Sequence, residues 1–103
     1  MSTAPWYVTI AALREYMAMA GYRGELEDDN PDFRAAEREL LDLISSDRVR
    51  DTGRRSDSGA ETWRTGRIRL ARLPRSVILE LTVMPGPRAE GPLPQLLRVR
   101  RKA

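Results

Sequence analysis

Apolar side chains recur at helical spacing near the start of the chain. Ile10, Leu13 and Met17 lie three or four positions apart, as they would along one face of an α-helix. Thr9 stands directly before them and is a suitable N-cap residue. The pattern therefore predicts a helix over residues 10–20.

A second helical pattern begins at Asn30 and Pro31. Asn30 can cap the helix, and Pro31 has the backbone φ that its first turn requires. One apolar stripe follows, with polar residues between its members. It consists of Phe33, Ala36, Leu40, Leu43 and Ile44. We expect a helix over residues 31–45.

The apolar pattern changes from helical spacing to strand-like alternation in the second half. Val49–Asp51 is typical of a short strand entering a polar loop, Thr52–Ser58. Ala60–Arg64 and Arg67–Leu73 have the composition of two further strands, and Thr65–Gly66 between them suits a tight hairpin turn.

Two more strands are expected toward the C-terminus. Val77–Met84 is almost continuously apolar, which predicts the central strand of a sheet. Met84–Pro94 contains four prolines and two glycines, so it is expected to be a loop. Residues 95–101 alternate again, and Leu97 and Val99 are expected to share one face.

These elements predict a single α+β domain over residues 1–103, with two N-terminal helices packed on an antiparallel sheet of about four strands. Residues 10–46 form its helical part, residues 47–103 form an arginine-rich β part, and residues 1–5 are expected to be frayed. Residues 6–8 suit either a short strand or the lead-in to the first helix. The predicted core consists of Leu40, Leu43, Ile44, Val77, Leu79, Leu81 and Val83.

Charge separates the two halves of the chain. Residues 1–48 hold five arginines against ten acidic residues, whereas residues 49–103 hold twelve arginines and Lys102 against five acidic residues. Clustered guanidinium groups favour phosphate or carboxylate partners. Alanine, glycine and proline are also plentiful, so a GC-rich genome is the favoured explanation for the preference for arginine over lysine.

The composition excludes several kinds of chemistry. The chain has no cysteine and no histidine, so disulfides, thiolate nucleophiles and imidazole bases are absent. Its serines have no histidine partner, and no cofactor or metal motif is present. No apolar stretch is long enough to span a membrane and no secretory signal is recognisable, so we expect a cytoplasmic, non-enzymatic protein.

The first candidate site is the basic β part. Arginines flank the small-residue loop of the predicted hairpin, and they continue along the strands that follow. Such a surface can follow a phosphate backbone, while a tryptophan can stack on a base or simply anchor the core. The candidate residues for binding nucleic acid or a protein partner are Arg50, Arg54, Arg55, Trp63, Arg64, Arg67, Arg69, Arg98 and Arg100.

Two arrangements resemble known families. A helix at Phe33–Ser46 followed by a basic hairpin at Val49–Arg64 is similar to winged-helix DNA-binding domains, although two helices precede the hairpin here and the family normally has three. Two helices followed by an arginine-bearing antiparallel sheet resemble the small ribonuclease toxins of the RelE and ParE group. That resemblance implies cleavage of RNA by cationic residues, and it keeps a toxin open as an alternative.

The acidic connector before the second helix is the other candidate site. Its carboxylates lack the order of a calcium-binding loop, so a solvated linker is the default interpretation. A row of acids can also mimic phosphates, as in phage-encoded inhibitors of a host nuclease or CRISPR complex. The residues are Glu25, Glu27, Asp28, Asp29 and Asp32.

The leading hypothesis from the sequence is a small interaction protein of phage or mobile-element type. It would bind nucleic acid, or a protein complex that handles nucleic acid, through its arginine-rich β surface. The oligomeric state does not follow from the sequence.

Overall fold

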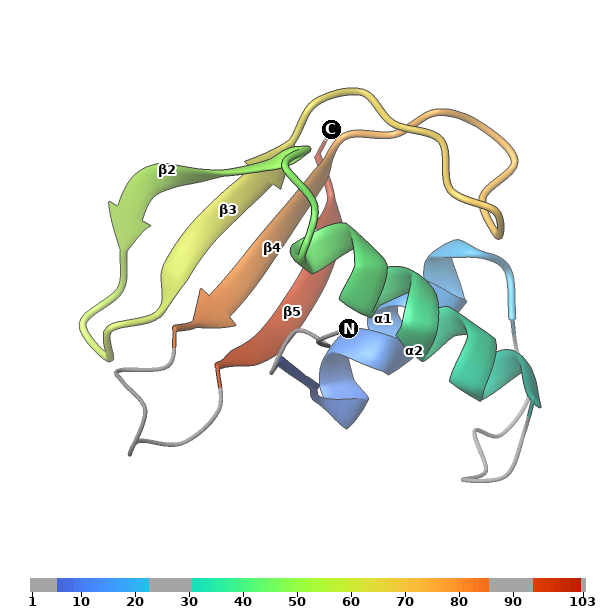
Figure 1. Cartoon of the computed structure of the whole chain (residues 1–103), viewed down its shortest axis with the longest axis horizontal. Coiled ribbons are helices and arrows are strands. Elements are labelled where there is room, and N and C mark those ends of the chain that lie inside the picture. Colours follow the sequence, from blue (N-terminus) through green and yellow to red (C-terminus); the bar gives the residue numbers. More distant parts are fainter. Residues whose placement is uncertain (1–5, 23–30, 86–93, 103) are drawn as a thin grey trace.

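The chain folds into two helices packed on a five-stranded mixed sheet, as seen in a computed structural model that describes residues 6–22, 31–85 and 94–102 (Figure 1). The helices are α1 (Ile10–Met19) and α2 (Pro31–Ile44). The strands are β1 (Tyr7–Val8), β2 (Val49–Arg55), β3 (Glu61–Thr65), β4 (Leu79–Met84) and β5 (Gln95–Arg101). The predicted α+β class is confirmed.

The sheet has the strand order β1-β5-β4-β3-β2. Strands β2, β3, β4 and β5 pair with one another in antiparallel fashion. The two-residue strand β1 pairs in parallel with the outer side of β5. The prediction of about four antiparallel strands therefore misses one short parallel strand. Val77–Met84 was expected to supply the central strand, and β4 does occupy the middle of the sheet.

Both helices begin where the sequence predicts and end one residue earlier. Thr9 caps α1, because its Oγ1 accepts a hydrogen bond from the Ala12 N–H at 3.2 Å. The same hydroxyl donates to the Leu96 carbonyl of β5 at 3.0 Å. This one side chain thus starts the helix and attaches it to the sheet.

Helix α1 runs along β5, and α2 packs against α1 and β1. The apolar faces of both helices meet one face of the sheet, so that residues distant in sequence form one buried cluster. All seven residues predicted for the core are buried, which confirms that prediction. Tyr16, Leu13, Leu96 and Val99 lie in the same core with at most 1% of their surface exposed.

A carboxylate of α1 satisfies the open edge of β5 beyond the short strand β1. Glu15 accepts a hydrogen bond from the Val99 N–H at 2.8 Å and another from Arg98 Nε at 2.6 Å. Partial burial disfavours the charge of Glu15, but these hydrogen bonds outweigh it and hold the pKa below its ordinary value. The helix therefore covers an edge that would otherwise be free to pair with another chain.

Four local predictions about the strands and their connections were wrong. The polar segment Thr52–Ser58 is not all loop, because β2 continues to Arg55. The register shifts between Asp51 and Arg54, and Gly53 there has a φ of 84°. A bulge with a glycine in the left-handed region allows the strand to resume pairing after the extra residues.

Arg67–Leu73 is not a strand, and Thr65–Gly66 is not a hairpin turn. Strand β3 ends at Thr65, which is buried. Its hydroxyl donates a hydrogen bond to the Gly66 carbonyl and accepts one from the Leu79 N–H. A single bridge, Ile68 to Val77, then closes a wide connection. Within it the Leu73 N–H donates to the Leu70 carbonyl, so the chain turns before Pro74 instead of extending.

The prediction that Leu97 and Val99 share one face of the sheet was also wrong. The register of β4 and β5 shifts between Thr82 and Val83, so that Val83 lies opposite Leu96. This irregularity interrupts the alternation at Leu97. Leu96 and Val99 are consequently the buried residues of β5, and Leu97 is only half-buried.

Candidate functional site

The face of the sheet opposite the helices carries a group of arginines. Side chains alternate between the two faces of a strand, and residues directly opposite on neighbouring strands share a face. Leu79, Leu81 and Val83 of β4 are fully buried against the core, so Glu80 and Thr82 between them lie on the other face.

The strand register extends this face across the sheet. Arg50, Arg64, Glu80 and Arg100 lie opposite one another in one row across β2, β3, β4 and β5. The next row is Arg54, Thr62, Thr82 and Arg98. We call the five arginines of these two rows the arginine face: Arg50, Arg54, Arg64, Arg98 and Arg100. With neighbouring strands 4.7–4.9 Å apart, the rows extend for about 14 Å from β2 to β5.

Glu80 is the one carboxylate in these two rows. Its Oε2 accepts a hydrogen bond from the Arg64 guanidinium at 2.7 Å and lies 3.7 Å from the Arg54 guanidinium. The hydrogen bond from Arg64, with the nearby charges of Arg54 and Lys102, holds the pKa of Glu80 below its ordinary value. Glu80 therefore stays ionised at neutral pH and orients two arginines that come from different strands.

The other members of the arginine face differ in how far they are neutralised. Arg98 bends to the edge of β5 and forms an ion pair with Glu15 at 2.6 Å. Among the residues that the structure describes, Arg50 and Arg100 form no ion pair, and both are exposed. The face therefore has an excess of positive charge, concentrated on β2 and on the end of β5.

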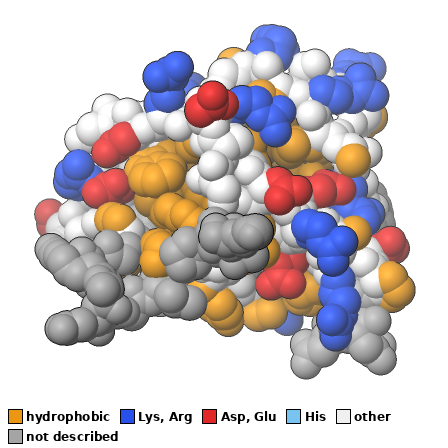
Figure 2. Space-filling model, viewed as in Figure 1, with side chains coloured by type: hydrophobic (Ala, Val, Ile, Leu, Met, Phe, Trp, Pro, Cys, Tyr) orange, Lys and Arg blue, Asp and Glu red, His pale blue; other side chains and the backbone are white. Residues whose placement is uncertain are grey.

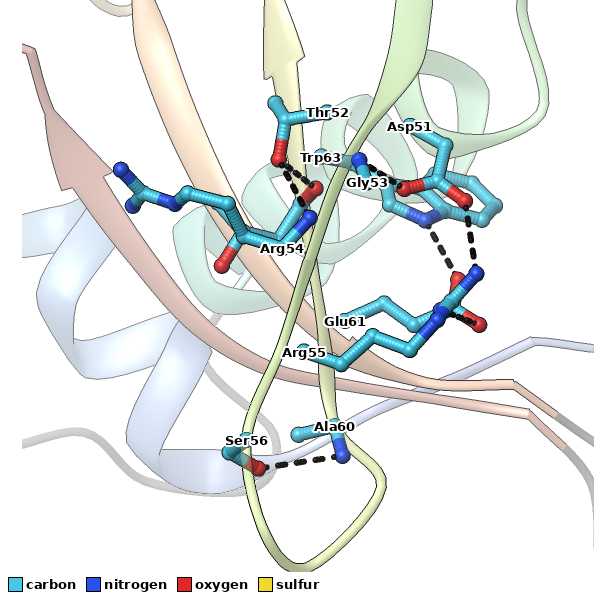
Figure 3. A network of polar contacts seen from close by, with 10 residues as sticks. Asp51, Thr52, Gly53, Arg54, Arg55, Ser56, Ala60, Glu61 and Trp63 are labelled. Atoms are coloured by element: carbon cyan, nitrogen blue, oxygen red, sulfur yellow. Dashed lines mark hydrogen bonds and ion pairs between the residues drawn. The ribbon is translucent and has the colours of Figure 1, made fainter.

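The structure divides the arginines that the sequence places together. Arg55 lies opposite Glu61, and Trp63 lies opposite Leu81, so both point to the helix side of the sheet. Figure 3 shows Arg54 on one side of β2 and Arg55 with Trp63 on the other. Arg67 and Arg69 are exposed, but they lie in the connection after β3 and not on a strand.

Arg55 and Trp63 belong to a network of their own (Figure 3). Arg55 forms ion pairs with Glu61 and, at 3.5 Å, with Asp51. The Trp63 indole N–H donates to Glu61 at 2.9 Å, and its ring meets that of Trp6 edge-on with centroids 5.4 Å apart. Trp63 is thus held by its neighbours and is not a base-stacking platform on the arginine face.

The helix side of the molecule has a mixed surface. Figure 2, in the same view as Figure 1, shows hydrophobic side chains exposed over the strands beside the helices, with acidic and basic groups around them. This surface therefore carries charges of both signs in similar measure.

Four residues of the proposed acidic site, Glu25, Glu27, Asp28 and Asp29, lie outside the described residues. The fifth, Asp32, is in the first turn of α2, and its carboxylate lies 3.8 Å from the Arg72 guanidinium. Arg72 also lies 3.3 Å from Glu39, which accepts a hydrogen bond from the Tyr16 hydroxyl. Burial, reinforced by Glu39, raises the pKa of Tyr16, so this phenol remains protonated.

Sequence reasoning missed Glu80, Thr62 and Thr82 as parts of the site. The alternation within Val77–Met84 was the available signal, since it already separates Glu80 and Thr82 from the apolar residues between them. Which arginines join them depends on the strand register, which the sequence pattern did not contain.

Among the described residues there is no group of acidic residues that could hold a metal ion and no helix long and apolar enough to cross a membrane. No protein-family model, curated protein or solved structure matches the chain.

Proposed function

We propose that this protein binds nucleic acid, without cleaving it, through the arginine face of its sheet. The observation that carries the proposal is the strand register, which places five arginines from three strands on the face opposite the helices, with Glu80 as the one carboxylate in their two rows. Guanidinium groups bind phosphates through paired hydrogen bonds and remain charged at every physiological pH.

The side chains of the arginine face favour contacts with the phosphate backbone of a nucleic acid over contacts with its bases. Besides arginine, its two rows contain Thr62, Thr82 and Glu80, and none of these offers an aromatic ring for a base to stack on. Phosphate contacts position a protein on nucleic acid but do not read its sequence. We therefore expect little sequence preference and a strong dependence of affinity on salt.

The test is fluorescence anisotropy with labelled single- and double-stranded DNA and RNA over a range of salt concentrations. The variant Arg50→Gln/Arg54→Gln/Arg100→Gln removes three exposed charges of the arginine face. The matched control is Arg14→Gln/Arg34→Gln/Arg38→Gln, which removes three exposed charges of the helices. Glutamine and arginine have similar helix propensities, so the control is expected to fold normally.

The face variant should bind every ligand more weakly, and its slope of log affinity against log salt should be shallower by about 2–3. The control should stay near the wild type in both quantities. The proposal fails if the wild-type protein binds none of the ligands at low salt, or if the two triple variants lose affinity equally.

A further inference from the structure

A depression lies at one end of the arginine face, where β2 begins and β3 ends. It has a volume of about 310 Å³ and is open to solvent. Its lining includes three arginines, Arg48, Arg50 and Arg64, together with Thr65 and Gly66 at the end of β3. Arg48 precedes β2, so the depression joins the arginine face to the turn after α2.

Two of these arginines occupy directly opposite positions on neighbouring strands. Arg50 and Arg64 are cross-strand partners in the register of β2 and β3, and like charges at opposite positions destabilise a sheet. Glu80 accepts a hydrogen bond from Arg64 on the side toward β4. Arg64 is thus partly neutralised by Glu80, whereas Arg50 forms no ion pair among the described residues.

The remaining charges do not neutralise the depression. Arg48 is exposed and forms no ion pair among the residues described. Asp51 contributes to the lining, but its carboxylate accepts a hydrogen bond from the Gly53 N–H at 2.8 Å and lies 3.5 Å from Arg55. An anion in the depression would relieve the repulsion between Arg50 and Arg64 and would bring Arg48 to the same site.

We propose that this depression binds a phosphate monoester, and specifically the terminal phosphate of a nucleic-acid strand lying on the arginine face. The inference rests on the proposed function. A terminal phosphate carries nearly two negative charges at neutral pH, as other phosphate monoesters do, whereas each internal phosphodiester carries one. Three arginines that line one depression therefore favour the end of a strand over its interior, while the remainder of the arginine face binds internal phosphates.

The experiment compares oligonucleotides of one sequence that carry a 5′-phosphate, a 3′-phosphate or hydroxyl groups at both ends. Each is titrated against the wild-type protein, Arg48→Gln and the control Arg34→Gln. Arg48 lies in the depression but outside the arginine face, so its loss should leave binding of the hydroxyl-ended strand almost unchanged. Inorganic phosphate alone is titrated in parallel and followed by NMR of the arginine side-chain N–H groups.

We expect one of the two phosphorylated strands to bind about five- to tenfold tighter than the hydroxyl-ended strand. This preference should disappear in Arg48→Gln and persist in Arg34→Gln. Equal binding of all three strands by the wild type would overturn the inference and leave the proposed function standing.

The two sources of phosphate give different results. If no strand binds but inorganic phosphate shifts the signals of Arg48, Arg50 and Arg64, the depression binds free phosphate, and the nucleic-acid function fails instead. If neither a strand nor inorganic phosphate has any effect, both proposals are overturned.

Discussion

Replacing Glu80 with glutamine should strengthen the binding of nucleic acid. Glu80 occupies the row between Arg64 and Arg100 and neutralises part of the arginine face. A phosphate bound to Arg64 would lie about 6 Å from this carboxylate, where two like charges repel each other by about 0.7–3 kcal/mol at effective dielectric constants between about 80 and 20. Salt screens the exposed part of this repulsion, so we expect a gain in affinity of about three- to tenfold.

The control for this prediction is Glu61→Gln. Glu61 is on the neighbouring strand β3 and is similarly sheltered, with 15% of its side chain exposed compared with 23% for Glu80. Its carboxylate points to the helix side, where it contacts Arg55 and Trp63. Both substitutions change the net charge of the protein by the same amount, but only the substitution of Glu80 changes the charge of the arginine face.

Anisotropy titrations at several salt concentrations measure the affinity of both variants, and urea denaturation shows whether each has folded. Glu80→Gln should bind more tightly and show a steeper salt dependence than the wild type, whereas Glu61→Gln should gain less than twofold. Equal gains in the two variants would show that net charge alone controls binding. A loss of affinity in Glu80→Gln would show that orienting Arg54 and Arg64 matters more than neutralising them.

Three further predictions concern stability and chemistry. Leu79→Ala should lower the free energy of unfolding by about 2–5 kcal/mol, because Leu79 is fully buried in the central strand; a urea midpoint close to that of the wild type would contradict this topology. Folding lowers the pKa values of Glu15 and Glu80. The ionised carboxylates should therefore contribute their full stabilisation above the ordinary carboxyl pKa of about 4.3. This stabilisation should be lost as the pH falls through the lower pKa of the folded state. Urea denaturation between neutral pH and about pH 3 measures that loss, which should be smaller in Glu15→Gln; an equal loss in this variant would contradict the assignment. The protein should cleave no nucleic acid, because it has neither histidine nor cysteine for proton transfer or nucleophilic attack. A ribonuclease toxin would be favoured instead if a bacterium that expresses the protein stopped growing and showed new RNA ends, and if both effects were lost on mutating Arg64 or Arg69.

The sequence pattern predicted the helices, the central strand and the core well, because each depends on local periodicity. The stripe from Phe33 to Ile44 and the alternation around Leu79 mark the surfaces that must be buried. The pattern predicted the pairing of strands poorly, because bulges alter alternation without a strong local signal. The bulge at Gly53 extends β2 into a segment that resembles a loop, and the irregularity near Leu97 changes which residue of β5 is buried.

For the candidate site, too, the sequence predicted the general region but not the arrangement that strand pairing produces. Composition and charge identified the arginine-rich half, but not which of its arginines share a surface. Arg54 and Arg55 are adjacent in sequence, and only the strand register shows that they point to opposite faces. Glu80 lies on the face opposite the helices, where it accepts a hydrogen bond from Arg64 of the neighbouring strand.

The most direct test of the arginine face is therefore a comparison of Arg54→Gln with Arg55→Gln. Each substitution removes one charge from the same strand, and the two side chains lie on opposite faces of the sheet. Arg54→Gln should weaken binding alike for unrelated sequences and make the slope of log affinity against log salt shallower by about 0.7–0.9. Arg55→Gln should leave both the affinity and the slope near those of the wild type. Equal losses in the two variants, or a larger loss in Arg55→Gln, would contradict binding through the arginine face.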